Sequence, residues 1–241
     1  MNNIKILSDL NQYLEDGIDI VNSINDNING RVALNQDLSA TQVLYAMREL
    51  MKDDCKVVLE IGTLWGGALL TMMRSKYKSK FVSIDTFSGF YPELLGEGNS
   101  DQDYGINTIE LVTDNMNNNN PHNHEFDLIK GSSHDEKVIK YIKTNYPNID
   151  LLFIDGDHTK KGVLQDFDDY SNLVNKNGII IFDDYWVGEH EKSAWKKEDE
   201  GGVKWMDVVG AVDEIISSKQ FSEKWVDVGL YGDKKIIQRI K

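Results

Sequence analysis

The sequence predicts an α/β protein built on a doubly wound, mostly parallel sheet of seven strands, with an antiparallel hairpin at its C-terminal end. Two observations predict this class. Five short apolar runs alternate with stretches of helical spacing, and the last two runs of the chain have no helix between them. Strands that are apolar along their whole length are typical of parallel sheets covered by helices on both faces, whereas neighbouring strands without a helix form a hairpin.

The expected strands are short and rich in Val, Ile, Leu and Phe. Each of the first five precedes a segment long enough for a helix, which is the pattern of repeated βα units. The predicted strands are 57–61, 81–84, 126–129, 151–154 and 179–182, followed by the hairpin strands 225–228 and 235–240.

The segment before the first strand is predicted to be an N-terminal helical cap over residues 1–52. One helix is expected over 6–14 and a second from Ser39. Ser39 and Gln42 have the spacing at which two side chains cap each other's backbone donors. Apolar residues then recur at helical spacing: Val43, Leu44, Met47, Leu50 and Met51.

Composition narrows the class of protein. The 241 residues are 40% hydrophobic and 27% charged, which is ordinary for one globular domain. The sequence has no apolar run of ~18 residues and no secretory signal pattern, so we expect a cytoplasmic protein. The net charge of −14 disfavours nucleic acid and anionic lipid, and a small-molecule substrate fits better. A lone cysteine, Cys55, excludes an intramolecular disulfide and a Cys-rich zinc site.

Two strand ends indicate a site for an adenosine-containing cofactor. The first strand runs into a turn that carries Gly62 and Gly66, where the backbone can turn sharply and approach a ligand closely. The next strand ends in Asp85, whose carboxylate can accept both ribose hydroxyls. Because the G-x-G-x-x-G fingerprint is absent, NAD is disfavoured and S-adenosylmethionine is preferred.

Carboxylates follow the fourth and fifth strands: Asp155 and Asp157 the fourth, Asp183 and Asp184 the fifth. The carboxyl ends of neighbouring parallel strands meet in one crevice, where ligands of such sheets bind. Carboxylates this close repel one another unless a cation or proton lies between them, and Mg²⁺ prefers oxygen ligands. Alternatively, each of these residues is a helix cap or a turn residue.

These motifs resemble class I S-adenosylmethionine-dependent methyltransferases, in particular the macrocin-type and catechol-type metal-dependent O-methyltransferases. The likeness covers residues 56–241 and rests on three segments: the turn at 60–66, Ile84-Asp85-Thr86-Phe87-Ser88-Gly89-Phe90, and Ile154-Asp155-Gly156-Asp157-His158. The resemblance implies a Rossmann-like fold with a cofactor-binding methyltransferase domain over 53–241. It also implies methyl transfer to a hydroxyl of a small molecule or sugar.

The resemblance also assigns roles to single residues. It places the metal, Mg²⁺ or another divalent cation, on Asp155, Asp183 and Asp184. The proton acceptor is His158 by the catechol-type pattern and Asp157 by the macrocin-type pattern, and an ordinary pKa near ~6.5 favours the histidine. Ser133 and His134 would face the adenine, although capping of the following helix is an equal alternative. The expected cofactor contacts are Glu60, Gly62, Thr63, Gly66, Asp85, Ser133, His134 and Asp155.

Several alternatives stay open at this point. A metal-independent methyltransferase would use His158 alone, and a non-catalytic nucleotide-binding domain would keep only the fold. Selectivity for the substrate is expected from the segments 91–107 and 185–204. Trp186, Trp195 and Trp205 would line the site as an aromatic wall or close the lid on the core. Residues 115–124, which include the His122/His124 pair, are expected to form a surface connection. A homodimer would form through the N-terminal helices.

Overall fold

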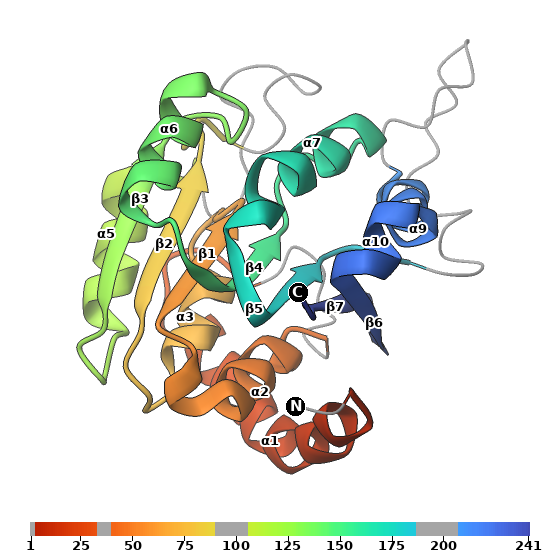
Figure 1. The fold of residues 1–241 in the computed structure, drawn as a ribbon. Coiled ribbons are helices and arrows are strands. Elements are labelled where there is room, and N and C mark those ends of the chain that lie inside the picture. The colour runs from red at the N-terminus through yellow and green to blue at the C-terminus, as the bar shows by residue number, and fades with distance from the viewer. Residues whose placement is uncertain (1–2, 33–39, 90–105, 187–206) are drawn as a thin grey trace, which may run out of the picture.

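A computed structural model describes residues 3–32, 40–89, 106–186 and 207–241 of the chain (Figure 1). One sheet of seven strands runs through the molecule in the order β3-β2-β1-β4-β5-β7-β6. Strands β1 to β5 pair in parallel, and β7 pairs antiparallel with β5 and β6. The strands are β1 Val57–Ile61, β2 Lys80–Asp85, β3 Glu125–Lys130, β4 Ile149–Ile154, β5 Val174–Phe182, β6 Trp225–Tyr231 and β7 Lys234–Arg239. The predicted fold class is confirmed.

The strand order reverses at β1, which lies between β2 and β4. The chain moves from β1 outward to β3, then returns to the other side of β1 and continues through β4 and β5. At such a switch point the connections after two adjacent strands diverge to opposite faces, which opens a crevice at the carboxyl ends of the strands. The expected cofactor turn and the expected acidic residues follow strands that end at this edge.

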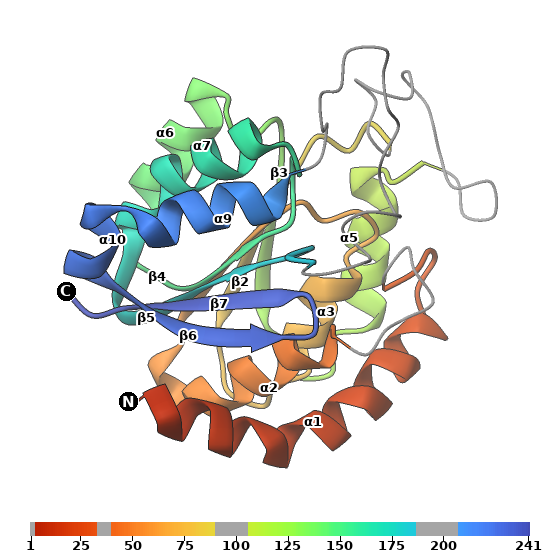
Figure 2. The same cartoon turned by 90° about the vertical axis from the view of Figure 1, so that its right-hand side faces the viewer.

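Helices cover both faces of the sheet, and each face has its own apolar core (Figure 2). One face packs against α1 Asn3–Asn25, α2 Gln42–Met51, α3 Gly67–Met73 and α5 Ile109–Asn118. The other face packs against α6 Glu136–Asn145, α7 Lys160–Tyr170, α9 Val208–Ser217 and α10 Lys219–Lys224. Single-turn helices η1 Lys52–Asp54 and η2 Ser171–Leu173 precede β1 and β5. None of the described helices is both long and apolar enough to cross a membrane.

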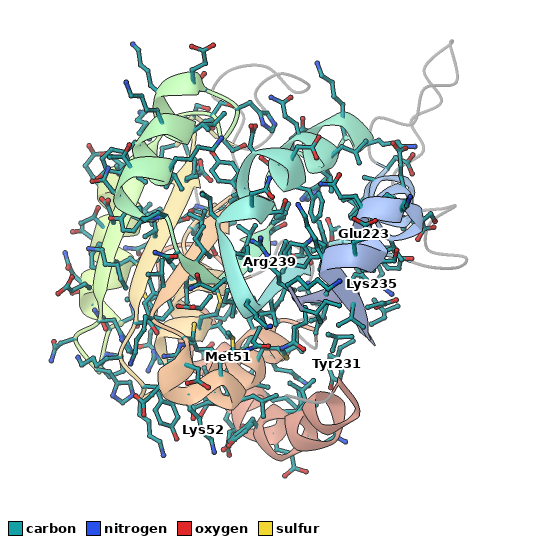
Figure 3. All side chains as sticks on the ribbon, viewed as in Figure 1. Met51, Lys52, Glu223, Tyr231, Lys235 and Arg239 are labelled. Carbon is teal, nitrogen blue, oxygen red and sulfur yellow. The ribbon has the colours of Figure 1, made fainter. Side chains whose placement is uncertain are left out.

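The N-terminal helices share the core of the sheet face that they cover. Arg48 of α2 is fully buried, and its guanidinium donates to the backbone oxygens of Lys52 and Tyr77 at 2.8 and 2.6 Å. Tyr231 at the end of β6 lies toward these helices and accepts a hydrogen bond from Gln42 (Figure 3). The division of the chain at residue 52 stays a prediction.

Both predicted N-terminal helices exist with different bounds. The first extends to Asn25, well beyond residue 14. The second begins at Gln42, with Thr41 as an N-cap that makes no side-chain hydrogen bond, while Ser39 lies outside the described residues. The predicted mutual capping of Ser39 and Gln42 is therefore not part of the described helix start.

The prediction of a surface connection over 115–124 is wrong in its first half. Helix α5 includes Asn115, whose side chain is 2% exposed and donates to the backbone oxygens of Trp65 and Asn29 at 2.9 and 3.0 Å. An asparagine amide can replace a backbone partner in this way, so a polar run is no sign of exposure by itself. His124 is also buried, with Nε2 2.8 Å from the oxygen of Ser75, which accounts for its position without a metal.

Candidate active site

The turn after β1 depends on two glycines with left-handed backbone conformations. Gly62 has φ 88°, and a Cβ at this position would lie 2.0 Å from the backbone oxygen of Asp155. Gly66 has φ 87° and is the N-cap of α3. L-residues with side chains rarely adopt such φ values. Glycine at position 62 therefore allows the ends of β1 and β4 to approach each other at the centre of the crevice.

Asp85 at the end of β2 holds this turn in place. Its Oδ2 accepts hydrogen bonds from the backbone N–H groups of Thr63 and Leu64 at 2.8 and 3.0 Å. Its Oδ1 accepts from the backbone of Phe87 at 2.6 Å and from the side chain of Asn107 at 3.2 Å. Asn107 is 2% exposed, and sequence reasoning missed it because no motif marks its position.

Glu60 is completely buried beneath the same turn. Its Oε2 accepts hydrogen bonds from Thr63 Oγ1 at 3.0 Å and from Ser83 Oγ at 2.6 Å. Its Oε1 has no hydrogen-bond partner among the described residues. Burial raises the pKa of Glu60 to about 8. A buried carboxyl oxygen without a donor can accept a hydrogen bond from a polar group of a ligand.

The turn after β3 brings Ser133 and His134 against α7. Ser133 is 9% exposed, and its backbone oxygen accepts a hydrogen bond from Tyr170 Oη at 2.5 Å. His134 Nδ1 lies 3.5 Å from Oδ1 of Asp166, a fully buried residue whose pKa burial raises to about 7. The N-cap of α6 is Asp135, so neither Ser132 nor Ser133 is the N-cap that the alternative reading required.

His158 lies between the carboxylates that follow β4 and β5. Its Nε2 is 3.1 Å from Asp155 Oδ1, and its Nδ1 is 3.3 Å from Asp184 Oδ2. Burial alone would lower the pKa of His158, but the hydrogen bond to Asp155 and the charge of Asp184 raise it to about 9. Burial and then the charge of Asp183 raise the pKa of Asp155 well above its usual range. The negative charge of these carboxylates favours the binding of a cation between them.

Asp183 contacts a second cationic side chain, that of Lys234. Its Oδ1 accepts the backbone N–H of Asp184 at 2.7 Å and contacts Lys234 Nζ. Lys234 also lies 2.8 Å from Asp233 Oδ1, and both of these residues are buried. Burial would lower the pKa of Lys234, but the charges of Asp183 and Asp233 raise it. Sequence reasoning missed this pair, because it lies at the turn from β6 into β7, far along the chain from β4 and β5.

The carboxylates offer ligands that fit a hard divalent ion. Asp184 has φ 51°, an unusual left-handed conformation for a residue with a side chain, which is typical of functional sites. Among the described residues, Asp183, Asp184 and Asp233 offer oxygens that all lie within 4.8 Å of one another. Mg²⁺ takes oxygen ligands of this kind. This group differs from the predicted set in containing Asp233 where the prediction has Asp155.

Asp157 is not part of this charged group. It is exposed, and its two oxygens accept hydrogen bonds from the backbone N–H and the hydroxyl of Thr159, at 2.8 and 3.1 Å. Thr159 is in turn the N-cap of α7. The carboxylate of Asp157 therefore stabilises the turn into α7, while the adjacent His158 points into the crevice between Asp155 and Asp184.

In the described part of the expected substrate region, Trp186 is the aromatic side chain that contacts the acidic residues. Trp186 Nε1 donates to Asp184 Oδ1 at 3.0 Å, which places the indole beside the acidic residues. Trp195, Trp205 and most of the segments 91–107 and 185–204 lie outside the described residues.

Comparison with known sequences gives two matches. Residues 59–185 match the family model described as a methyltransferase domain. An uncharacterized protein of Acanthamoeba polyphaga mimivirus, R132, is 37% identical over 134 residues, which are 56% of this chain and 53% of that protein. The chain thus spans about half the length of this curated relative.

Comparison with solved structures shows the same fold at low identity. An O-methyltransferase from Bacillus cereus in complex with SAH has a TM-score of 0.60 and 16% identity, over 95% of this chain and 91% of that chain. The MycE methyltransferase of the mycinamycin biosynthetic pathway, in complex with Mg, SAH and mycinamycin VI, has a TM-score of 0.57 and 14% identity, over 92% of this chain and 55% of that chain. Because the family model spans more than half of the chain and the fold agrees, the chain belongs to the class I S-adenosylmethionine-dependent methyltransferases.

Proposed function

We propose that the chain transfers the methyl group of S-adenosylmethionine to a hydroxyl oxygen of a small molecule or sugar, assisted by a divalent cation. The observation that carries this proposal is the convergence of Asp155, His158, Asp183 and Asp184 at the strand edge beside the Gly62 turn. A cytoplasmic location and a homodimer stay predictions.

The cofactor is proposed to lie across the ends of β1, β2 and β3. Asp85 would accept the ribose through Oδ1 in place of the Asn107 amide, while its Oδ2 keeps the backbone N–H groups of Thr63 and Leu64. Glu60 offers the unpaired Oε1 to the ammonium of the methionine part. Ser133 and His134 would face the adenine.

The metal is proposed to be held by Asp155, Asp183 and Asp184. When bound, a divalent ion supplies positive charge that lowers the pKa of an acceptor hydroxyl and orients its oxygen. Methyl transfer from a sulfonium is an in-line displacement, so a fixed and partly deprotonated oxygen reacts faster. The three carboxylates would bind the ion, and Trp186 fixes one oxygen of Asp184 through a hydrogen bond.

His158 is proposed as the group that accepts the hydroxyl proton. Its imidazole contacts Asp155 and Asp184, whereas Asp157 is occupied by the start of α7. Without other cations, these carboxylates keep the pKa of His158 at about 9 and the ring protonated at neutral pH. A cation bound to the same carboxylates would offset their negative charge and lower the pKa of His158. Neutral imidazole then becomes available as the base.

The test is to incubate the protein with S-adenosylmethionine, Mg²⁺ and a panel of hydroxylated acceptors, and to measure S-adenosylhomocysteine. We expect turnover that EDTA abolishes and that added Mg²⁺ or Mn²⁺ restores. Full turnover in EDTA would instead establish a metal-independent methyltransferase. Cofactor binding without turnover on any hydroxylated acceptor would contradict O-methyl transfer.

A further inference from the structure

Lys234 is a buried lysine at the start of β7 that lies inside the acidic group. It is 5% exposed, and its ammonium contacts carboxylates from two directions, Asp183 and Asp233. Asp233 is itself 6% exposed, and its backbone oxygen accepts the N–H of Tyr185 at 2.8 Å. A charge that is removed from water in this way needs its partners, so the ammonium and the two carboxylates form one unit.

The contacts of Lys234 divide the two oxygens of Asp183 between different tasks. Oδ1 receives both the ammonium of Lys234 and the backbone N–H of Asp184. These two donors use the lone pairs of Oδ1 and fix the plane of the carboxylate, which leaves Oδ2 to bind a further ligand.

Two overlapping sets of three carboxylates compete for an ion at this edge. Asp183 and Asp184 are common to both, and the third member is either Asp155 after β4 or Asp233 before β7. By distance alone, the set with Asp233 converges. However, the ammonium of Lys234 already lies on Asp233 and on one oxygen of Asp183, and it repels a divalent ion from that side.

We propose that Lys234 is a positioning residue that selects the metal ligands. Its ammonium removes Asp233 and Asp183 Oδ1 from the site, so that the ion binds Asp183 Oδ2 together with Asp184 and Asp155. This inference rests on the metal in the proposed function. It predicts that Asp233 is not a ligand while Lys234 is present and becomes one when the ammonium is removed.

The test is a cycle of variants in which Mn²⁺ binding is measured by electron paramagnetic resonance and calorimetry, in the absence of turnover. Asp233→Asn is made in the natural chain and in Lys234→Met, which keeps the length of the side chain without its charge. We expect Asp233→Asn to change the Mn²⁺ dissociation constant less than about threefold in the natural chain, and to raise it about tenfold or more in Lys234→Met.

Lys235→Met is the matched control, because the ammonium of Lys235 binds Asp227 on the hairpin. In that background Asp233→Asn should again have little effect. Circular dichroism and thermal unfolding show whether each variant folds. Should Lys234→Met not fold, Lys234→Gln replaces it in the cycle, since an amide keeps a hydrogen-bond donor near Asp183.

The possible outcomes separate this inference from the proposed function. A large effect of Asp233→Asn in the natural chain would overturn the inference, because Asp233 would then be a ligand despite Lys234. Equal small effects in both backgrounds, or loss of Mn²⁺ binding in a folded Lys234→Met, would overturn it too, while the metal site itself would stand. If the natural chain binds no Mn²⁺, both the metal and the inference fall.

Discussion

The two halves of the site neutralise their carboxylates by different means. At the end of β2, Asp85 accepts backbone N–H groups from its own turn and from the neighbouring one. At the ends of β4 and β5, Asp155 and Asp184 share the ring of His158. Backbone donors are fixed by the fold, whereas a charged side chain can be replaced by a stronger cation.

This difference indicates how each half responds to its ligand. The half that includes Asp85 has its conformation before any cofactor binds, because the Asp85 carboxylate and the backbone N–H groups of the turn already hydrogen-bond to each other. The half that includes His158 concentrates negative charge that the side chains of His158 and Lys234 offset, and the raised pKa of His158 and Asp155 reflects this. We therefore expect the first half to be rigid and the second to depend on ions.

The largest expected effect concerns the proton acceptor in the ionic half. Replacing His158 with Ala should lower turnover by about 10² to 10⁴-fold at saturating cofactor and Mg²⁺, since a general base contributes this much. Asp157→Asn is the matched comparison and should stay within about tenfold, because Asp157 stabilises the start of α7. The reverse ranking, with Mn²⁺ binding intact in both variants, would assign the proton to Asp157.

A smaller effect is expected in the half that backbone donors hold. Asp85→Ala should weaken binding of S-adenosylhomocysteine by about 1.5 to 3 kcal/mol, the usual cost of losing a hydrogen bond to a charged group. Calorimetry measures this, with Asp53→Ala as an exposed control. Mn²⁺ binding should be unchanged, because the carboxylates after β4 and β5 keep their partners. A parallel loss of Mn²⁺ affinity would show that the two halves are not independent.

The smallest expected effect, taken for each pH unit, is a dependence of stability on pH that arises at Glu60. Burial raises the pKa of Glu60 to about 8, above its value in the unfolded chain, so the folded state holds a proton that the unfolded state has lost. The contribution is fully present below about pH 4.5 and is lost as the pH rises toward 8, at about 1 kcal/mol per pH unit. Urea unfolding between pH 5 and 9 measures the slope.

Glu60→Gln should show a shallower slope over the same range, because the amide does not titrate. Asp166 and His158 titrate in both proteins, so their contributions cancel in the difference between the two slopes. Identical slopes would mean that Glu60 ionises as readily in the folded chain as in the unfolded one.

The sequence by itself determined the sheet and the positions of the expected ligands at its edge. All seven predicted strands are present, and β1 has the predicted bounds. Apolar periodicity is a local property, and residues that follow parallel strands come together whatever the rest of the chain does. For this reason Gly62, Asp85, Asp155 and Asp184 could be proposed as site residues from their positions alone.

Only the tertiary structure decided which groups accompany them. Asn107 reaches Asp85 from the segment before α5, and Lys234 reaches Asp183 from the hairpin, across a separation that no local pattern spans. Asp157 and His158 are adjacent in the chain and equivalent as candidates. However, Asp157 is exposed, whereas His158 is buried between two carboxylates. The two side chains point in different directions at the start of α7. These directions depend on how α7 packs against β4 and β5, which the spacing of residues in the sequence does not determine.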